Sequence, residues 1–234
     1  QAQESQLDAG LRQYMLRVYN YMASGLVLTG IFAYGGTKFP ALLNLMYSVG
    51  PGGSYSPTLF AWIVMLSPLA FILVLNFGIQ RMQASTAQAV FWIFSAIMGL
   101  SLTHIFIVYT GASITRVFFI TAGTFAAMSL YGYTTKRDLS KFGSFLFMGL
   151  IGIIIASVVN IFMQSSAMAF VISVIGVLVF VGLTAHDTQN IKRMYIEGEQ
   201  SETATKKAVM GALSLYLDFL NLFMMLLHLF GDRR

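Results

Sequence analysis

The sequence predicts an all-α membrane protein, a bundle of seven transmembrane helices, and three observations support this fold class. Hydrophobic residues make up 57% of the 234 residues and charged residues only 10%, whereas soluble domains carry about a quarter charged residues. Apolar stretches of about 20 residues, the length that crosses a bilayer, recur along the chain. Basic residues gather in alternate loops between these stretches. A soluble core could not hide so much apolar surface, whereas lipid accepts it directly.

Each expected span has the length of a membrane helix. The first is the most polar, because an arginine and an asparagine lie near its start. Pro68 predicts a kink in the second span, which neighbouring helices can accommodate. Gly, Pro and Ser in residues 35–40 and 50–57 favour turns between the first two spans. The seven spans are expected at residues 14–34, 58–77, 87–109, 114–133, 142–163, 167–185 and 208–230.

The loop charges predict the orientation of the chain. Ten basic residues fall on the side of the N-terminus and four on the other side. Because cytosolic loops carry the excess of Lys and Arg, the N-terminus is expected in the cytosol and the C-terminus outside. We expect a polar cytosolic tail at residues 1–13 and one transmembrane domain at residues 14–231. The ten are Arg12, Arg17, Arg81, Lys136, Arg137, Lys141, Lys192, Arg193, Lys206 and Lys207, and the four are Lys38, Arg116, Arg233 and Arg234.

Composition also excludes several kinds of site. The chain has no cysteine, which excludes disulfides, thiolate metal sites and cysteine nucleophiles. No two histidines share a metal-ligand spacing with a carboxylate, so a zinc site is not expected. The net charge of +5 is explained by orientation in the membrane, so no nucleic-acid partner is expected. We therefore expect the lipid bilayer as a partner and no cofactor. His104 is interpreted as a packing residue, and His186 and His228 as residues exposed at the membrane interface.

Asp218 is the most unusual acidic residue, because it lies in the middle of the last apolar stretch. It comes ten residues after Ala208, so it lies about 15 Å into the helix, near the centre of a hydrocarbon core about 30 Å thick. An isolated carboxylate there costs at least about 2.5–3.5 kcal/mol. Asp218 must therefore be protonated, paired or exposed to water. Ser214 and Asn221 lie on the same helical face and form a polar stripe with it.

Asp187 is the second acidic residue near the membrane, where the sixth span reaches the cytosolic face. Thr184 lies one turn before it and Asn190 one turn after it. Both aspartates approach the membrane from the same half, so a meeting with Asp218 is geometrically reasonable. Two carboxyl groups in a low-dielectric site would tend to share one proton. The alternative is that each aspartate is satisfied separately by hydroxyl and amide partners.

Three segments together resemble the Bax inhibitor-1 family of transmembrane proteins, especially its bacterial YccA-like branch. They are YGYTTKRDLSKFG at residues 131–143, GLTAHDTQNIKRMY at residues 182–195 and ALSLYLDFLNLF at residues 212–223. The resemblance implies six helices around a central seventh and a location in the bacterial inner membrane. It also implies a pH-sensitive calcium leak, gated by an aspartate pair that matches Asp187 and Asp218.

The resemblance further implies a basic residue on the second helix that pairs with the first aspartate, and Arg81 is the candidate. Family members often carry another acidic residue in the early helices, and this chain has none there. A deprotonated aspartate pair would attract Ca²⁺, which prefers six to eight hard oxygen ligands. Asp187 and Asp218 would therefore form a transient Ca²⁺ site, with H⁺ as the competing ion.

Two other functions remain open at this point. Intramembrane aspartyl proteases also use two membrane aspartates, but this chain has LYLDF where those enzymes have GxGD. A regulatory protein that binds a membrane protease or another membrane partner is the main alternative. A retinal protein is excluded, because no lysine lies within the last span. We expect a channel and not an enzyme.

Overall fold

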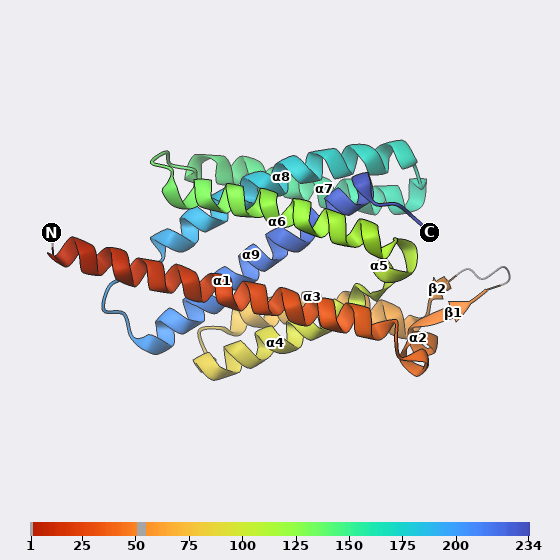
Figure 1. The fold of residues 1–234 in the computed structure, drawn as a ribbon, viewed down its shortest axis with the longest axis horizontal. Helices are drawn as coiled ribbons and strands as arrows, with labels where there is room; N and C mark the ends of the chain where they lie inside the picture. The colour runs from red at the N-terminus through yellow and green to blue at the C-terminus, as the bar shows by residue number, and fades with distance from the viewer. Residues whose placement is uncertain (1, 51–54) are drawn as a thin grey trace. The chain divides into compact units, whose positions relative to one another are not determined.

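The computed structural model describes residues 2–50 and 55–234, with side chains from residue 9 onward. Its regular structure is helical except for one short hairpin, and the chain divides into two compact units (Figure 1). Unit 1 contains residues 1–15, 110–197 and 214–233, and unit 2 contains residues 16–109, 198–213 and 234. Two helices are divided between the units, α1 (Ala2–Gly36) and α9 (Ser201–Phe230).

Unit 2 contains the early helices and the hairpin. Helix α3 packs against α4, and α2 packs against α3. Strand β1 pairs antiparallel with β2, with Ser48 opposite Ser56. Besides its parts of α1 and α9, unit 2 contains α2 (Pro40–Met46), β1 (Tyr47–Val49), β2 (Tyr55–Pro57), α3 (Leu59–Gly78), α4 (Ala84–Ser101) and α5 (Thr103–Val108).

Unit 1 contains the helices that carry both membrane aspartates. Helix α8 packs against both α6 and α7, and the three run side by side in Figure 1. Besides its parts of α1 and α9, unit 1 contains α6 (Gly111–Thr134), α7 (Ser140–Met163) and α8 (Ser166–Arg193).

The all-α membrane fold is confirmed, with six helices in the described residues that are long and apolar enough to span a bilayer. A seventh span results if α1 and α2, which meet at 90°, are counted together. The number seven and the orientation of the termini remain predictions. Helix α9 is the most buried span, with 67% of its apolar window buried against 6–39% in the other five.

Several local features differ from the sequence-based expectation. The third span consists of two helices, α4 and α5, which meet at Leu102. The connection between the first two spans was expected to form turns at residues 35–40 and 50–57, but its described residues also form α2 and the β1–β2 hairpin, and Pro40 occupies the first turn of α2. Helix α1 begins at Ala2, so the described part of the expected tail is helical. Helix α3 continues through Pro68.

Helices α6 and α8 approach closely because small residues face each other. A Cβ atom at Gly132 would meet the backbone carbonyl oxygen of Ala185. One turn earlier on α6, the Ser129 hydroxyl shares a buried hydrogen bond of 2.9 Å with the Thr188 hydroxyl. Small residues allow such close backbone contact, and hydroxyl bonds between helices add to it in lipid. The contact positions the part of α8 that carries Asp187.

The last turn of α8 holds the loop between α6 and α7. Gln189 accepts a hydrogen bond of 2.8 Å from the Leu139 amide and donates one of 2.8 Å to the Arg137 carbonyl oxygen. Arg193 donates a hydrogen bond of 2.7 Å to Asp138, and it also donates to the Ser140 hydroxyl. These bonds connect the end of α8 to the loop between α6 and α7 and to the first residue of α7.

Substitution of Gly132 by Ala should destabilise the protein, because the new methyl group would force α6 and α8 apart. Overpacking of this kind costs about 1–3 kcal/mol. Unfolding of the purified protein in detergent micelles would measure the change. Gly123→Ala on the same helix is the matched control, since a Cβ atom there would meet no described atom within 4 Å beyond its chain neighbours and the nearby backbone of its own helix. Equal stability of the two variants would contradict the close contact.

The Asp138 carboxyl should stay ionised far into the acid range. Its hydrogen bond from Arg193, together with bonds from Ser140, lowers the pKa of Asp138 from 3.8 to about 2. Because the folded pKa is depressed, this ion pair contributes fully above about pH 4 and is lost as the pH falls through about 2. A carbon-13 NMR titration of the Asp138 carboxyl should show its midpoint near 2. A midpoint near the ordinary value would contradict the pairing with Arg193.

Candidate functional site: two membrane aspartates

Asp218 lies inside the helix packing, in the part of α9 that belongs to unit 1. The residue is only 5% exposed. Within the described part of the chain, its Oδ2 atom has no hydrogen-bond partner. A buried polar atom without a partner is costly and calls for an explanation, such as water, an ion or a proton. The structure thus shows that Asp218 is buried in the protein, and its depth in the membrane stays a prediction.

Asp187 lies in α8 and is half-buried, with 25% of its side chain exposed. Its Oδ1 atom lies 2.8 Å from Nδ1 of His186. It also lies near enough to Asp218 for the two carboxyl groups to act on each other electrostatically. Unit 1 therefore contains one fully buried carboxyl group and a second, more accessible one within electrostatic range.

His186 is the residue of this site that the sequence interpretation missed. It was expected to be exposed at the interface, but its side chain is only 16% exposed and bonds to Asp187. Consecutive residues of a helix point in different directions, so the His–Asp sequence alone gives no reason to expect their contact. Gly143 makes room for the ring, because a Cβ atom there would lie 2.5 Å from His186 Nε2. Asn190 places its side-chain nitrogen 3.2 Å from the same ring nitrogen.

The other polar residues expected near the aspartates bond mainly within their own helices. Thr184 donates a hydrogen bond of 2.7 Å to the Phe180 carbonyl oxygen. Asn221 donates one of 2.8 Å to the Leu217 carbonyl oxygen. Ser214 is half-buried on α9, four residues before Asp218. The supporting roles proposed for Thr184, Asn221 and Ser214 stay predictions.

Arg81 follows α3 in unit 2 and is exposed. Its backbone amide bonds to the Gly78 carbonyl oxygen at 2.9 Å. Asp187 belongs to unit 1. The ion pair between Arg81 and Asp187 therefore stays a prediction.

A tight metal site is not present among the described residues, because no three His, Asp or Glu side chains gather there. Asp187 and Asp218 would supply two carboxyl groups to a cation. Ca²⁺ takes six to eight oxygen ligands in stable sites, so water and backbone carbonyls would have to provide the others. This arrangement suits brief contact with a cation better than storage.

Comparisons with known proteins agree with the resemblance seen in the sequence. The family model described as inhibitor of apoptosis-promoting Bax1 matches residues 11–234. Inner membrane protein YbhL of Escherichia coli is 48% identical over 231 residues, which cover 97% of this chain and 94% of that protein. An uncharacterized protein of Rickettsia prowazekii is 46% identical over 227 residues, covering 97% and 92%. An uncharacterized membrane protein of Streptococcus pyogenes is 36% identical over 227 residues, covering 97% and 96%.

These matches also bear on location. The Escherichia coli relative is named as an inner membrane protein, and the Streptococcus pyogenes relative as a membrane protein. Together with the six apolar helices of the described residues, they confirm the expected location in a bacterial inner membrane. Because the family model covers nearly the whole chain, and relatives of 36–48% identity match it almost end to end, the chain belongs to the Bax inhibitor-1 (YccA-like) family.

Proposed function

We propose that this protein is a pH-sensitive leak channel for cations, with Ca²⁺ as the ion, gated by Asp187 and Asp218. One observation carries the proposal: Asp218 is buried with an unpartnered carboxyl oxygen, and a second carboxyl group lies within electrostatic range. Ionisable residues within membrane spans are expensive and by default mark an ion pathway or a proton relay.

In the closed state the two carboxyl groups hold one proton between them. A buried carboxylate alone costs at least about 2.5–3.5 kcal/mol in a membrane. A proton held by the pair removes one of its two negative charges. The pair then has little attraction for a cation, and helix α9 keeps its packing around Asp218.

Loss of the shared proton leaves both carboxyl groups negatively charged. Two close negative charges repel each other and attract a divalent cation with hard oxygen ligands. Because the pair lacks the six to eight oxygens of a stable Ca²⁺ site, the ion would not be held. Flux should therefore rise as the pH rises and the pair loses its proton.

His186 is well placed to adjust this proton exchange. Its Nδ1 atom lies 2.8 Å from Oδ1 of Asp187, so a hydrogen bond from the ring would stabilise the carboxylate form of Asp187. The half-buried His186–Asp187 pair thus connects the fully buried Asp218 to more accessible surroundings.

A cavity of about 520 Å³, lined by both polar and apolar residues, approaches Asp218 along α9. Its lining includes Asn160 of α7, Ser173 of α8 and Met225 of α9. Met225 lies seven residues after Asp218, or about 10 Å along the helix. Water in this cavity would come within about two helical turns of the buried carboxyl group.

Substitution of Asp218 by Asn should abolish the pH dependence of Ca²⁺ flux, because the amide cannot release a proton. The measurement is Ca²⁺ uptake into liposomes that contain the purified protein, at about pH 6, 7 and 8. Asp232→Asn is the matched control, since Asp232 is exposed and pairs with Arg116. No flux above that of empty liposomes at any pH would refute the channel and favour the partner-binding alternative.

Substitution of His186 by Gln should move the midpoint of the flux–pH curve upward by about one to two pH units. A hydrogen bond between charged groups contributes about 1.5–3 kcal/mol, and about 1.4 kcal/mol corresponds to one unit. Without the hydrogen bond from His186, the carboxylate form of Asp187 loses a partner, so flux should begin at higher pH. The same liposome assay measures the midpoint, with His104→Gln as control, because His104 bonds to the Ser101 carbonyl oxygen in unit 2. An unchanged midpoint would remove His186 from the mechanism.

A further inference from the structure

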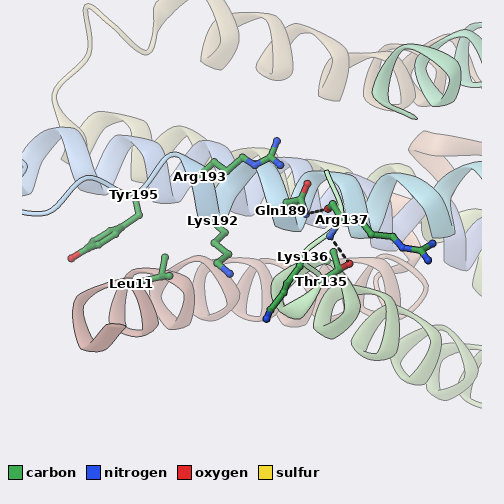
Figure 2. Close-up of a pocket in the computed structure, with 9 residues that line it drawn as sticks. Leu11, Thr135, Lys136, Arg137, Gln189, Lys192, Arg193 and Tyr195 are labelled. Carbon is green, nitrogen blue, oxygen red and sulfur yellow. Dashed lines mark hydrogen bonds between the residues drawn. The ribbon is translucent and has the colours of Figure 1, made fainter. Parts of the chain in front are cut away.

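A basic cavity of about 330 Å³ lies where the end of α8 meets the loop between α6 and α7 (Figure 2). Four of its lining residues are cationic, and among the described residues that line it none is Asp or Glu. The positive-inside rule explains why basic residues lie in this loop. It does not explain why they surround a cavity. The four are Lys136, Arg137, Lys192 and Arg193.

The four cations are not equally available. Arg193 is occupied by its ion pair with Asp138, at 2.7 Å. Lys192 donates a hydrogen bond of 2.8 Å to the Tyr133 carbonyl oxygen and lies 4.8 Å from the centre of the Tyr133 ring. Neither Lys136 nor Arg137 forms a side-chain ion pair with any carboxylate in the part of the chain that the structure describes. Three cations therefore remain around the cavity without a neutralising carboxylate.

The directions of the side chains indicate which of these three cations can bind the same ligand. In Figure 2 the Lys136 and Lys192 side chains extend to the same side of α8, and Arg193 points to the other side. Lys192 keeps two further ammonium protons for a ligand after its bond to Tyr133. Two ammonium groups that point the same way can share one anion, and each would donate charge-assisted hydrogen bonds to it.

The walls of the cavity are held in place before any ligand arrives. Gln189 bonds to the Arg137 carbonyl oxygen at 2.8 Å and thereby holds the loop, as the dashed line in Figure 2 marks. Thr135 accepts a hydrogen bond of 3.2 Å from the Arg137 amide. Tyr195 closes another part of the wall, and its ring lies 5.8 Å from that of Tyr14. The volume of about 330 Å³ falls at the lower end of the range of small-molecule sites, about 300–1,000 Å³.

We propose that this cavity binds a phosphate group, with Lys136 and Lys192 as its main ligands. The phosphate belongs either to the headgroup of an anionic phospholipid or to a soluble phosphate compound. Phosphate oxygens suit this site, because they accept several charge-assisted bonds at once. The cavity lies at the end of a membrane span, where basic pockets meet lipid headgroups. This inference does not depend on the proposed channel activity.

Native mass spectrometry of the detergent-solubilised, full-length protein tests the site with two lipids, short-chain phosphatidylglycerol and phosphatidylcholine. The wild type should retain one phosphatidylglycerol in preference to phosphatidylcholine. Lys136→Gln should weaken this binding, and the double variant Lys136→Gln, Lys192→Gln should weaken it about tenfold or more. Lys136 is exposed, so its single substitution tests the site even if loss of the Lys192–Tyr133 bond disturbs the end of α6.

The double variant Lys206→Gln, Lys207→Gln is the matched control. It removes the same charge from the same predicted side of the membrane, but from residues paired with Glu202 and Glu199. Inorganic phosphate is then added to separate the two sources. If phosphate displaces the lipid and binds by itself in phosphorus NMR, the natural ligand is soluble; if it does neither, the ligand is the headgroup. Equal loss of phosphatidylglycerol in both double variants, or no preference in the wild type, would overturn the proposal.

Discussion

The burial of one carboxyl group in the last helix is the constraint on which the arrangement of unit 1 depends. Asp218 is 5% exposed, and it lies in α9, a helix that contains a stretch apolar enough to span a membrane. A charge in that position is unfavourable in hydrocarbon and in a close-packed protein interior. Asp218 must therefore hold a proton or meet water or an ion, and Asp187, which contacts His186, is the carboxyl group that acts on it electrostatically.

The helix packing keeps this partner in position. Gly132 lets α6 contact the backbone of α8 at Ala185, and the Ser129–Thr188 bond fixes the register of the two helices. Asp187 lies between these two contact residues of α8 in the sequence. At its end, α8 is bonded through Gln189 to the loop that follows α6. Close-packed helices have low compressibility and transmit strain. The loss or gain of one proton in such packing would therefore shift the helices themselves and not only the loops.

Much of this could be predicted from the sequence, because the bilayer imposes a simple rule of length and polarity. Hydropathy predicted the long apolar helices that the structure contains, whereas the position of Asp218 near the membrane centre stays a prediction from helical rise. The bond between His186 and Asp187 could not be predicted, because it depends on the space left by Gly143 on another helix. The hairpin near Ser48 and Ser56 was missed because its strands have only three residues each, too few for a clear alternating pattern.

Infrared difference spectroscopy tests directly whether Asp187 and Asp218 hold one proton jointly. The carbonyl stretch of a protonated carboxyl group would be followed between about pH 6 and pH 8 in the wild type, the two Asp→Asn variants and the double variant. A shared proton predicts that either single substitution removes or shifts the whole wild-type band, so that the effects are not additive. Two bands that disappear independently, one with each substitution, would contradict the account.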